Sequence, residues 1–451
     1  MTNSISYFMI FGKYFESKWA IYFHIGLHKK INIFIATNGN SWYYNNGYLL
    51  KGSVNMLAEA MVELGKKRST IREIFEYGNQ RAKIVGRENI FDFSIGNPNV
   101  PAPETVTKTL LDIIQSENPA VLHGYTSAQG ADFVRESISA SINRRFGTNF
   151  TKDNLYMTVG AAAAISIVFK ALTVPGDEFI VFAPFFPEYA CFIEKGAGAK
   201  CVIVPADTES FQINFEEFEK RINEKTKGVV INSPNNPSGA VYSEETIKRL
   251  TALLAEKEKE YGHAIYLISD EPYREIAYDG VEIPYVTKYY KNTFVCYSYS
   301  KSLSLPGERI GYIVVPQEME DWQDAYAAVC GAGRILGYVN APSMFQRVAA
   351  KCAEETADIS IYQRNRDLLY EGMTSFGYNV VKPQGAFYLF PQALEADERA
   401  FCERAKKYDL LLVPGTDFGC PGFLRISYCV KTEQVERALP LFEKLAKEYG
   451  K

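Results

Sequence analysis

The sequence has 451 residues, with 49 Lys and Arg against 53 Asp and Glu and a formal net charge of −4. Hydrophobic residues make up 47%, charged residues 23% and aromatic residues 14%. This profile predicts a globular protein with a large core, of about two or three domains, and excludes collagen-like, low-complexity and disordered chains. The charges are nearly balanced and form no basic stripe, so no nucleic-acid partner is expected.

The eight cysteines include no C-x-x-C pair, and the chain has only four histidines. This spacing argues against zinc fingers, thioredoxin-like motifs and His-rich metal sites, so no metal is expected. A chain of this length does not depend on a disulfide scaffold. We therefore expect reduced thiols and a cytoplasmic protein.

Residues 1–55 differ from the rest of the chain because they are rich in aromatic residues, Asn and Lys. Lys18 and His24 interrupt the apolar stretch, which shows neither a membrane-span pattern nor a secretory signal. Three interpretations are open: a structured arm, a membrane or targeting segment, and upstream sequence translated from a misplaced start. We favour the last, with Met56 or Met61 as the true start, and expect no membrane association.

Helical and strand-like segments alternate from residue 56 onward. Residues 56–85 are expected to be helical, 91–96 to form a strand and 97–103 a Pro-rich loop. A helix should begin after the N-cap Ser243 and stop at Gly262. Six further apolar strands are expected at 178–183, 199–206, 228–233, 264–269, 293–298 and 309–315. The alternation predicts an α/β fold with a mostly parallel central sheet covered by helices.

Three of the expected strands run into polar, turn-forming segments: SPNNPSG at 233–239, DEPY at 270–273 and YSKSLSLPGER at 299–309. Ligands of such sheets bind beyond the carboxyl ends of the strands. We therefore expect the Lys, Asp, Tyr, Asn, Ser and Arg side chains of these segments to form one site.

These segments resemble the class I and II aminotransferases, enzymes that use pyridoxal 5'-phosphate (PLP) in the fold called type I. The resemblance rests on NNPSG, on the D-x-x-Y of DEPY, on S-x-S-K and on the Arg eight residues after that Lys, and it extends over roughly residues 60–451. It looks most like the bacterial aspartate and aromatic aminotransferases. It implies a large PLP-binding domain at 105–349 and a smaller α+β domain formed by 56–104 and 350–451.

The resemblance implies roles at the cofactor ring. Lys301 would hold PLP as a Schiff base and later move a proton at the substrate α-carbon, which requires a neutral amine and therefore a lowered pKa. Asp270 would pair with the pyridine nitrogen, and Tyr273 and Asn236 would donate to the ring's phenolic oxygen. Phe186 would stack on the ring, although its aromatic neighbours leave this choice open.

The resemblance also implies a phosphate cradle. Arg309 and the hydroxyls of Ser298 and Ser300 would bind the phosphate oxygens. The backbone N–H groups of Ala161 and Ala162, at the start of the helix in 158–172, would add the positive end of a helix dipole.

Tyr125 resembles the tyrosine that reaches the phosphate of the neighbouring subunit. This implies a homodimer with shared active sites, whereas a tyrosine packed in the core is the alternative.

Arg425, in GFLRISY, is implied to bind the substrate α-carboxylate through two parallel hydrogen bonds, with Gly96 and Asn236 close to the same group. One bacterial subgroup carries a Lys for a second substrate carboxylate where this chain has Ala162. Dicarboxylate preference is therefore in doubt, and Arg334 is a candidate replacement.

The predicted function is transfer of an α-amino group between an L-amino acid, aspartate/glutamate or aromatic, and a 2-oxo acid. A PLP β-lyase of the same fold is the alternative. A PLP-binding transcriptional regulator would need an N-terminal DNA-binding domain, for which residues 1–55 are too short and too aromatic.

Overall fold

The computed structural model describes residues 57–66 and 69–451, together with the backbone of five strands within residues 9–52. The chain forms two compact units, Met1–Ser69 and Thr70–Lys451. The strands of the first unit, β1 (Met9–Ile10), β2 (Ala20–Ile25), β3 (Ile31–Thr37), β4 (Asn40–Asn45) and β5 (Tyr48–Gly52), pair antiparallel in chain order. The remaining residues of 1–56 lie outside the described part of the chain, and the choice among the three interpretations of this segment stays a prediction.

The region 56–85 contains two helices, α1 (Glu59–Lys66) in the first unit and α2 (Thr70–Val85) in the second. None of the residues of α1 is buried. The break coincides with Ser69 and Thr70, residue types that favour the start of a helix over its interior.

Seven strands form the central sheet of the second unit, in the order β7-β13-β12-β11-β10-β8-β9. They are β7 (Leu155–Thr158), β8 (Glu178–Phe182), β9 (Lys200–Val204), β10 (Thr226–Asn232), β11 (Tyr266–Asp270), β12 (Thr293–Ser298) and β13 (Gly311–Val314). Strands β9, β8, β10, β11 and β12 pair in parallel, and β13 is antiparallel to both of its neighbours. The predicted α/β class with a mostly parallel sheet is confirmed, with β7 as an additional strand.

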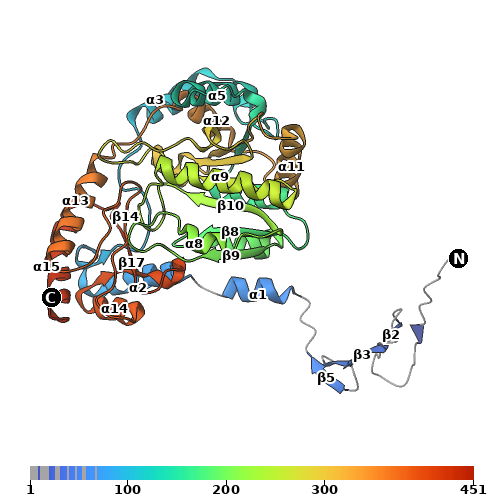
Figure 1. The fold of residues 1–451 in the computed structure, drawn as a ribbon, viewed down its shortest axis with the longest axis horizontal. Helices are drawn as coiled ribbons and strands as arrows, with labels where there is room; N and C mark the ends of the chain where they lie inside the picture. Colours follow the sequence, from blue (N-terminus) through green and yellow to red (C-terminus); the bar gives the residue numbers. More distant parts are fainter. Residues whose placement is uncertain are drawn as a thin grey trace. The chain divides into compact units, whose positions relative to one another are not determined.

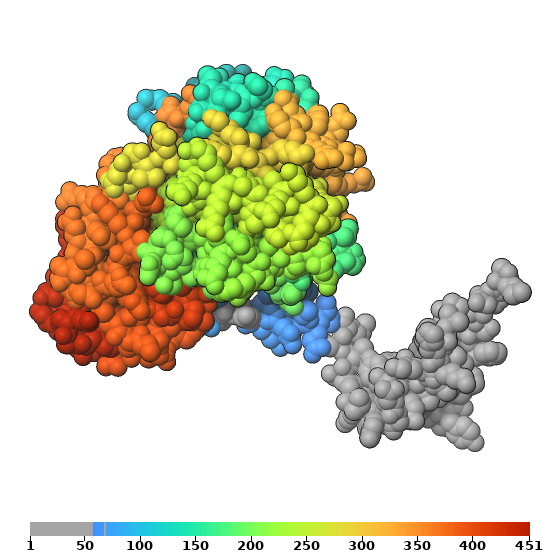
Figure 2. Space-filling view, viewed as in Figure 1, coloured from blue at the N-terminus to red at the C-terminus, as the bar shows by residue number. Residues whose placement is uncertain are grey.

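Helices cover both faces of this sheet (Figure 1). Successive side chains of β10 point to opposite faces: Val229 packs in the cluster of Leu250 from α9 (Glu244–Tyr261), whereas Val230 packs in the cluster of Phe169 from α6 (Ala161–Leu172). The predicted ends of α9 are confirmed, because the Ser243 side chain accepts from the Thr246 N–H at 3.0 Å and a left-handed Gly262 ends the helix. The outer surface of α9 faces the viewer in Figure 2.

The two ends of the second unit meet in small sheets. Strand β6 (Phe91–Asp92), shorter than predicted, pairs in parallel with β15 (Leu410–Leu411). Strands β14 (Tyr388–Leu389), β17 (Leu424–Ser427) and β16 (Val413–Pro414) form an antiparallel sheet beside them. This pairing joins residues 91–96 to the C-terminal segment. The proposed division into domains at 104/105 and 349/350 stays a prediction.

The remaining α-helices of the second unit are α3 (Glu104–Ser116), α4 (Pro119–Leu122), α5 (Asp132–Phe146), α7 (Glu188–Cys191), α8 (Phe215–Glu219), α10 (Tyr299–Ser302), α11 (Trp322–Ile335), α12 (Ser343–Lys351), α13 (Ser360–Ser375), α14 (Glu398–Ala405) and α15 (Thr432–Lys447). No disulfide joins any of the eight cysteines, all of which lie in the described part of the chain. Among the described residues, no helix combines the length and apolar character of a membrane span, and no three His, Cys, Asp or Glu side chains are grouped to hold a metal.

Candidate active site

The candidate site lies at the carboxyl ends of β10, β11 and β12, where the sequence predicted it. Lys301 lies on α10, directly after β12. Its Nζ donates to the carbonyl of Gly96 at 2.7 Å, which brings the segment after β6 into the site. Desolvation lowers the pKa of Lys301 to about 8, and the positive charges of Arg425 and Arg309 act in the same direction. At pH 7 about a tenth of the amine would be neutral, far more than for an ordinary lysine, and a nucleophilic amine requires this neutral form.

Asp270, the last residue of β11, is buried. Strand β11 pairs with β12, the strand that leads to Lys301. The Tyr189 hydroxyl donates to its Oδ2, and the Asn232 side chain donates to its backbone carbonyl at 2.9 Å. Burial raises the pKa of Asp270 to about 7, although the hydrogen bond from Tyr189 opposes that rise. Its Oδ1 has no hydrogen-bond partner among the described residues. A buried carboxylate oxygen without a partner fits a protonated ring nitrogen such as that of PLP.

Arg309 packs against the start of α6. A Cβ added to Gly160, the N-cap of this helix, would lie 2.6 Å from Arg309 Nη2, so the guanidinium needs the glycine. Gly160 has φ 91°, which also favours glycine. The first N–H groups of α6 have no partner within the helix, and those of Ala161 and Ala162 are among them. A cation therefore lies beside the positive end of a helix dipole, an arrangement that binds anions.

Two buried hydroxyls complete this cradle. Ser298 Oγ and Ser300 Oγ lie 2.7 Å apart, and Arg309 Nη1 donates to Ser300 Oγ at 3.4 Å. The cation, the hydroxyls and the helix start together form a donor set that matches the oxygens of a phosphate. This is the second feature of the chain that fits PLP.

Arg425, on β17, is a buried cation without an acidic partner. Among the described residues no carboxylate forms an ion pair with it, and its Nε has no hydrogen-bond partner. Its other nitrogens donate to Asn236 Oδ1 at 3.2 Å and to the Ser94 carbonyl at 2.5 Å. Burial lowers the pKa of Arg425. Because an uncompensated buried charge is costly, this guanidinium fits the carboxylate of a ligand.

Residues 88–441 match the family described as aminotransferase class I and II. The chain belongs to this family. The aspartate aminotransferase of Thermotoga maritima is 30% identical over 366 residues, which are 80% of this chain and 93% of that protein. The aspartate/prephenate aminotransferase of Thermus thermophilus is 30% identical over 78% of this chain and 89% of its own length. A solved amino transferase from Eubacterium rectale has 59% identity and a TM-score of 0.87, and covers 89% of this chain and all of that chain.

The predicted fold type, PLP dependence and amino-group transfer are therefore confirmed. The structure brings together the predicted residues of the ring, phosphate and carboxylate regions. The role of each side chain stays a prediction. Asn236 is held in place from two sides, since its backbone N–H donates to Asn232 Oδ1 at 2.7 Å and its side-chain oxygen accepts from Arg425. Its amide NH₂ group forms no hydrogen bond with the described residues.

The aromatic residues of the segment 183–189 (APFFPEY), which contains Phe186, separate into core and site positions. Phe185 is buried, and a Cβ on Gly419 would lie 2.6 Å from its ring. Phe186 is only partly buried, and its ring meets that of Tyr189 edge to face with centroids 5.6 Å apart. Since Tyr189 donates to Asp270, this contact places Phe186 at the edge of the site. Phe186 is thus better placed than Phe185 to stack on a bound ring.

Two predicted residues do not join the site within one chain. Tyr125 is 96% exposed, so a tyrosine packed in the core of this chain is excluded. Arg334 is exposed in the last turn of α11, although glycines on its N-terminal side would suit a turn. Glycine is tolerated within a helix at a modest cost, and here Gly331 and Gly333 form part of α11.

Three residues of the site had no predicted hydrogen-bonding role: Asn232, Tyr189 and Tyr388. Tyr388 lies on β14, and its hydroxyl is 2.8 Å from that of Tyr273. Asn232 could have been found, because it ends a parallel strand directly beside Asp270 in register. Tyr189 was one of the aromatic neighbours that left the choice of the stacking residue open, and Tyr388 lies in an apolar segment to which no role was assigned.

The lowered pKa of Lys301 predicts the pH dependence of PLP attachment to cofactor-free protein. The rate should rise about tenfold per pH unit at low pH and level off above about pH 8, because only the neutral amine reacts. Stopped-flow absorbance measures this rate, and a free lysine analogue provides the correction for the cofactor's own ionisations. A corrected rate that still rises tenfold per unit at about pH 10 would mean an ordinary exposed lysine.

Proposed function

We propose that this aminotransferase transfers the α-amino group of an L-amino acid to a 2-oxo acid with Lys301, Asp270 and Arg425 as its central residues. The observation that carries this assignment is the buried guanidinium of Arg425, which has no acidic partner in the described chain and shares a site with a lysine of lowered pKa. Amino acids and 2-oxo acids both carry the carboxylate that this cation lacks. A site of this kind accepts both substrates of transamination in turn.

The chain offers a fitting position for each part of PLP, which supplies an electron sink for negative charge at the substrate α-carbon. Asp270 would hold the pyridine nitrogen through its unpartnered Oδ1. Arg309, Ser298 and Ser300 would hold the phosphate together with the start of α6. Tyr273 and the free amide of Asn236 would donate to the ring oxygen.

Lys301 would act on the proton of the substrate α-carbon. Its Nζ is held in place by the Gly96 carbonyl, and its pKa of about 8 leaves it able both to accept and to return a proton near neutral pH. General acid–base catalysis of this kind contributes about 10²–10⁴-fold to a rate. The neighbouring cations Arg425 and Arg309 keep the amine from becoming more basic.

Arg425 would orient the substrate. A planar guanidinium binds a carboxylate through two parallel hydrogen bonds, which fixes direction as well as position. The rings of Tyr388 and Phe418 both lie 4.8 Å from its guanidinium carbon and limit its movement. The low dielectric of this buried position strengthens the attraction for the carboxylate.

We infer that uncharged or aromatic amino acids are better donors than aspartate. The relatives carry names that include aspartate, prephenate and aromatic amino acids. At the start of α6 this chain has Ala162, which supplies no positive charge for a second carboxylate. Arg334 is exposed, and among the described residues it forms no hydrogen bond or ion pair with a site residue of its own chain.

A panel of amino donors tests the function and the donor class together. Phenylalanine, tyrosine and alanine should give higher kcat/KM values than aspartate with 2-oxoglutarate as acceptor. With a donor alone, the purified enzyme should form one equivalent of 2-oxo acid per site and then stop. Continued release of ammonia would identify a lyase, and a preference for aspartate would overturn the inferred donor class.

Substitution of Arg425 tests the carboxylate site. Arg425→Ala should lower kcat/KM by about 10²–10⁴-fold for every donor, because two charge-assisted hydrogen bonds are lost. Arg425→Lys should recover part of the loss, since it keeps the charge but not the two parallel bonds. Steady-state kinetics over the donor panel provide the measurement, and a loss confined to one class of side chain would contradict the assignment.

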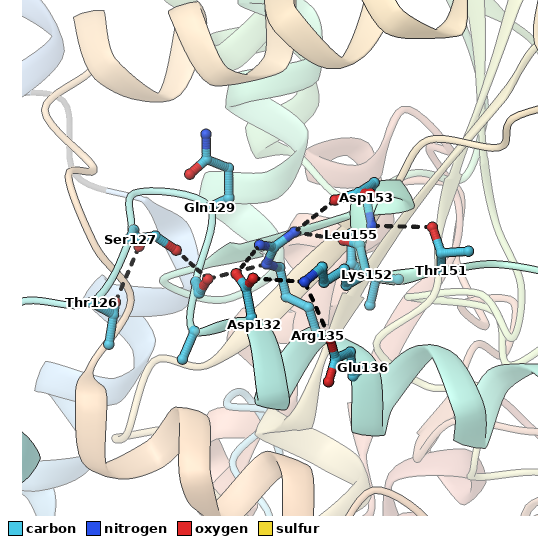
Figure 3. Close-up of polar contacts among 12 residues, drawn as sticks. Thr126, Ser127, Gln129, Asp132, Arg135, Glu136, Thr151, Lys152, Asp153 and Leu155 are labelled. Carbon is cyan, nitrogen blue, oxygen red and sulfur yellow. Dashed lines mark hydrogen bonds and ion pairs between the residues drawn. The ribbon is translucent and has the colours of Figure 1, made fainter.

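We further propose that the enzyme is a homodimer in which Tyr125 enters the partner's site. The segment that follows Tyr125 is firmly attached to its own subunit (Figure 3). Arg135 donates to the Gly130 carbonyl at 3.1 Å, and Asn340 donates to the carbonyls of Thr126 and Ser127 at 2.8 and 2.9 Å. A fixed loop that presents an almost fully exposed aromatic side chain is suited to contact a second copy.

Mixed dimers test whether the site is shared. Tyr125→Phe should weaken PLP binding by about tenfold through loss of one hydrogen bond to phosphate, and Lys301→Ala should abolish turnover. A dimer with one subunit of each kind regains one site in which Lys301 meets an intact Tyr125. Turnover at limiting PLP should therefore exceed that of either parent variant. If each chain used its own tyrosine, mixing would restore nothing.

A further inference from the structure

Tyr388 packs beside Arg425 through its ring, but its buried hydroxyl has no role in the proposed mechanism. It lies on β14, is 2% exposed, and its ring meets that of Tyr273 edge to face with centroids 5.7 Å apart. The two hydroxyl oxygens are 2.8 Å apart, a hydrogen-bond distance. Among the described residues neither hydroxyl has another hydrogen-bond partner. The two hydroxyls therefore form a short hydrogen-bond chain that has no further partner in the described chain.

The surroundings of Tyr388 fix this hydroxyl in place. A Cβ on Gly96 would lie 2.1 Å from it, so the phenol occupies space that only a glycine leaves free. The guanidinium of Arg425 lies over the ring at 4.8 Å. Burial raises the pKa of Tyr388 to about 12, while Arg425 pulls in the opposite direction. Tyr388 is therefore protonated at neutral pH, and the nearby cation makes its hydroxyl a stronger donor.

The direction of the hydrogen bond decides what Tyr273 can do. Each phenol has one proton to donate. If Tyr273 donates to Tyr388, it has no proton left for a ligand; if Tyr388 donates, the proton of Tyr273 is free to point into the site. A hydroxyl that accepts one hydrogen bond also donates more strongly, because bonds in a chain polarise one another. Arg425 acts on both phenols, but its guanidinium lies over the ring of Tyr388, and this direct contact favours the second direction.

We propose that Tyr388 is a positioning residue, which donates to Tyr273 and thereby directs the proton of Tyr273 toward the ring oxygen of PLP. This inference rests on the proposed place of Tyr273 at the cofactor ring. It gives β14 a function in the site, because the small sheet that carries Arg425 on β17 then also sets a hydrogen bond to the cofactor.

The spectrum of the holoenzyme reports this hydrogen bond. The visible absorption of PLP attached to Lys301 changes with pH, and donation to the ring oxygen lowers the midpoint by stabilising the ionised oxygen. Tyr388→Phe should raise the midpoint, by up to about one pH unit, and Tyr273→Phe should raise it further. In the double variant the Tyr388 substitution should add nothing to the effect of Tyr273→Phe.

Two controls separate positioning from packing. Tyr428→Phe removes another buried hydroxyl that is directed to the Ala386 carbonyl, not to Tyr273, and should leave the midpoint unchanged. Replacement of Tyr388 by 3-fluorotyrosine keeps the ring and strengthens the donor, so the midpoint should move downward. This second substitution keeps the test intact if Tyr388→Phe folds poorly.

An unchanged midpoint in a folded Tyr388→Phe enzyme, or an equal additional shift in the double variant, would overturn the inference. So would an unchanged or raised midpoint in the 3-fluorotyrosine enzyme. Failure of the proposed place of Tyr273 would look different, because Tyr273→Phe would then leave the midpoint unchanged as well.

Discussion

The site depends on ionisable side chains removed from water without an opposite charge of their own. Asp270 and Arg425 are buried, yet they do not pair with each other, and each keeps one polar atom without a hydrogen-bond partner in the described chain. Desolvation raises the pKa of the acid and lowers the pKa of the base, which is the effect of burial on isolated charges. The protein therefore carries electrostatic costs that bound ligands of complementary charge reduce.

Lys301 follows the same principle with a different outcome. Its pKa falls to about 8, and the cations near it cannot raise that value. A carboxylate in hydrogen-bond contact would have done the opposite and kept the amine protonated. The neutral Gly96 carbonyl as acceptor fixes the amine in space and leaves its basicity low.

The large sheet alone could not build this site. Its strand ends supply Asp270 and the turn that carries Lys301, whereas Arg425, the proposed carboxylate-binding residue, comes from β17, near the C-terminus. The parallel pairing of β6 with β15, and the hydrogen bond from the Ser427 N–H to the Phe93 carbonyl at 2.9 Å, join the segment before Gly96 to the C-terminal strands. Both ends of the folded unit therefore contribute residues to the candidate site.

The sequence could predict those parts of the fold and site that depend on neighbouring residues. Apolar runs followed by polar turns located the strand ends, and the resemblance of the segments around Lys301 and Asp270 to a known family implied the cofactor residues. Tyr189 and Tyr388 escaped because their partners lie 81 and 115 residues away along the chain. An aromatic residue in an apolar segment looks the same whether it fills the core or directs a hydrogen bond. Only the tertiary structure distinguishes the two.

The end of β10 explains how the two halves of the site keep a fixed separation. Asn232 donates to the backbone carbonyl of Asp270, and its side-chain oxygen accepts from the Asn236 N–H at 2.7 Å. Asn236 in turn accepts from Arg425, whose other nitrogen donates to Ser94. A continuous series of hydrogen bonds thus runs from the acid at the ring position to the cation at the substrate position. Because every link is buried, breaking one leaves an unsatisfied polar group, and this cost holds the acid and the cation in register.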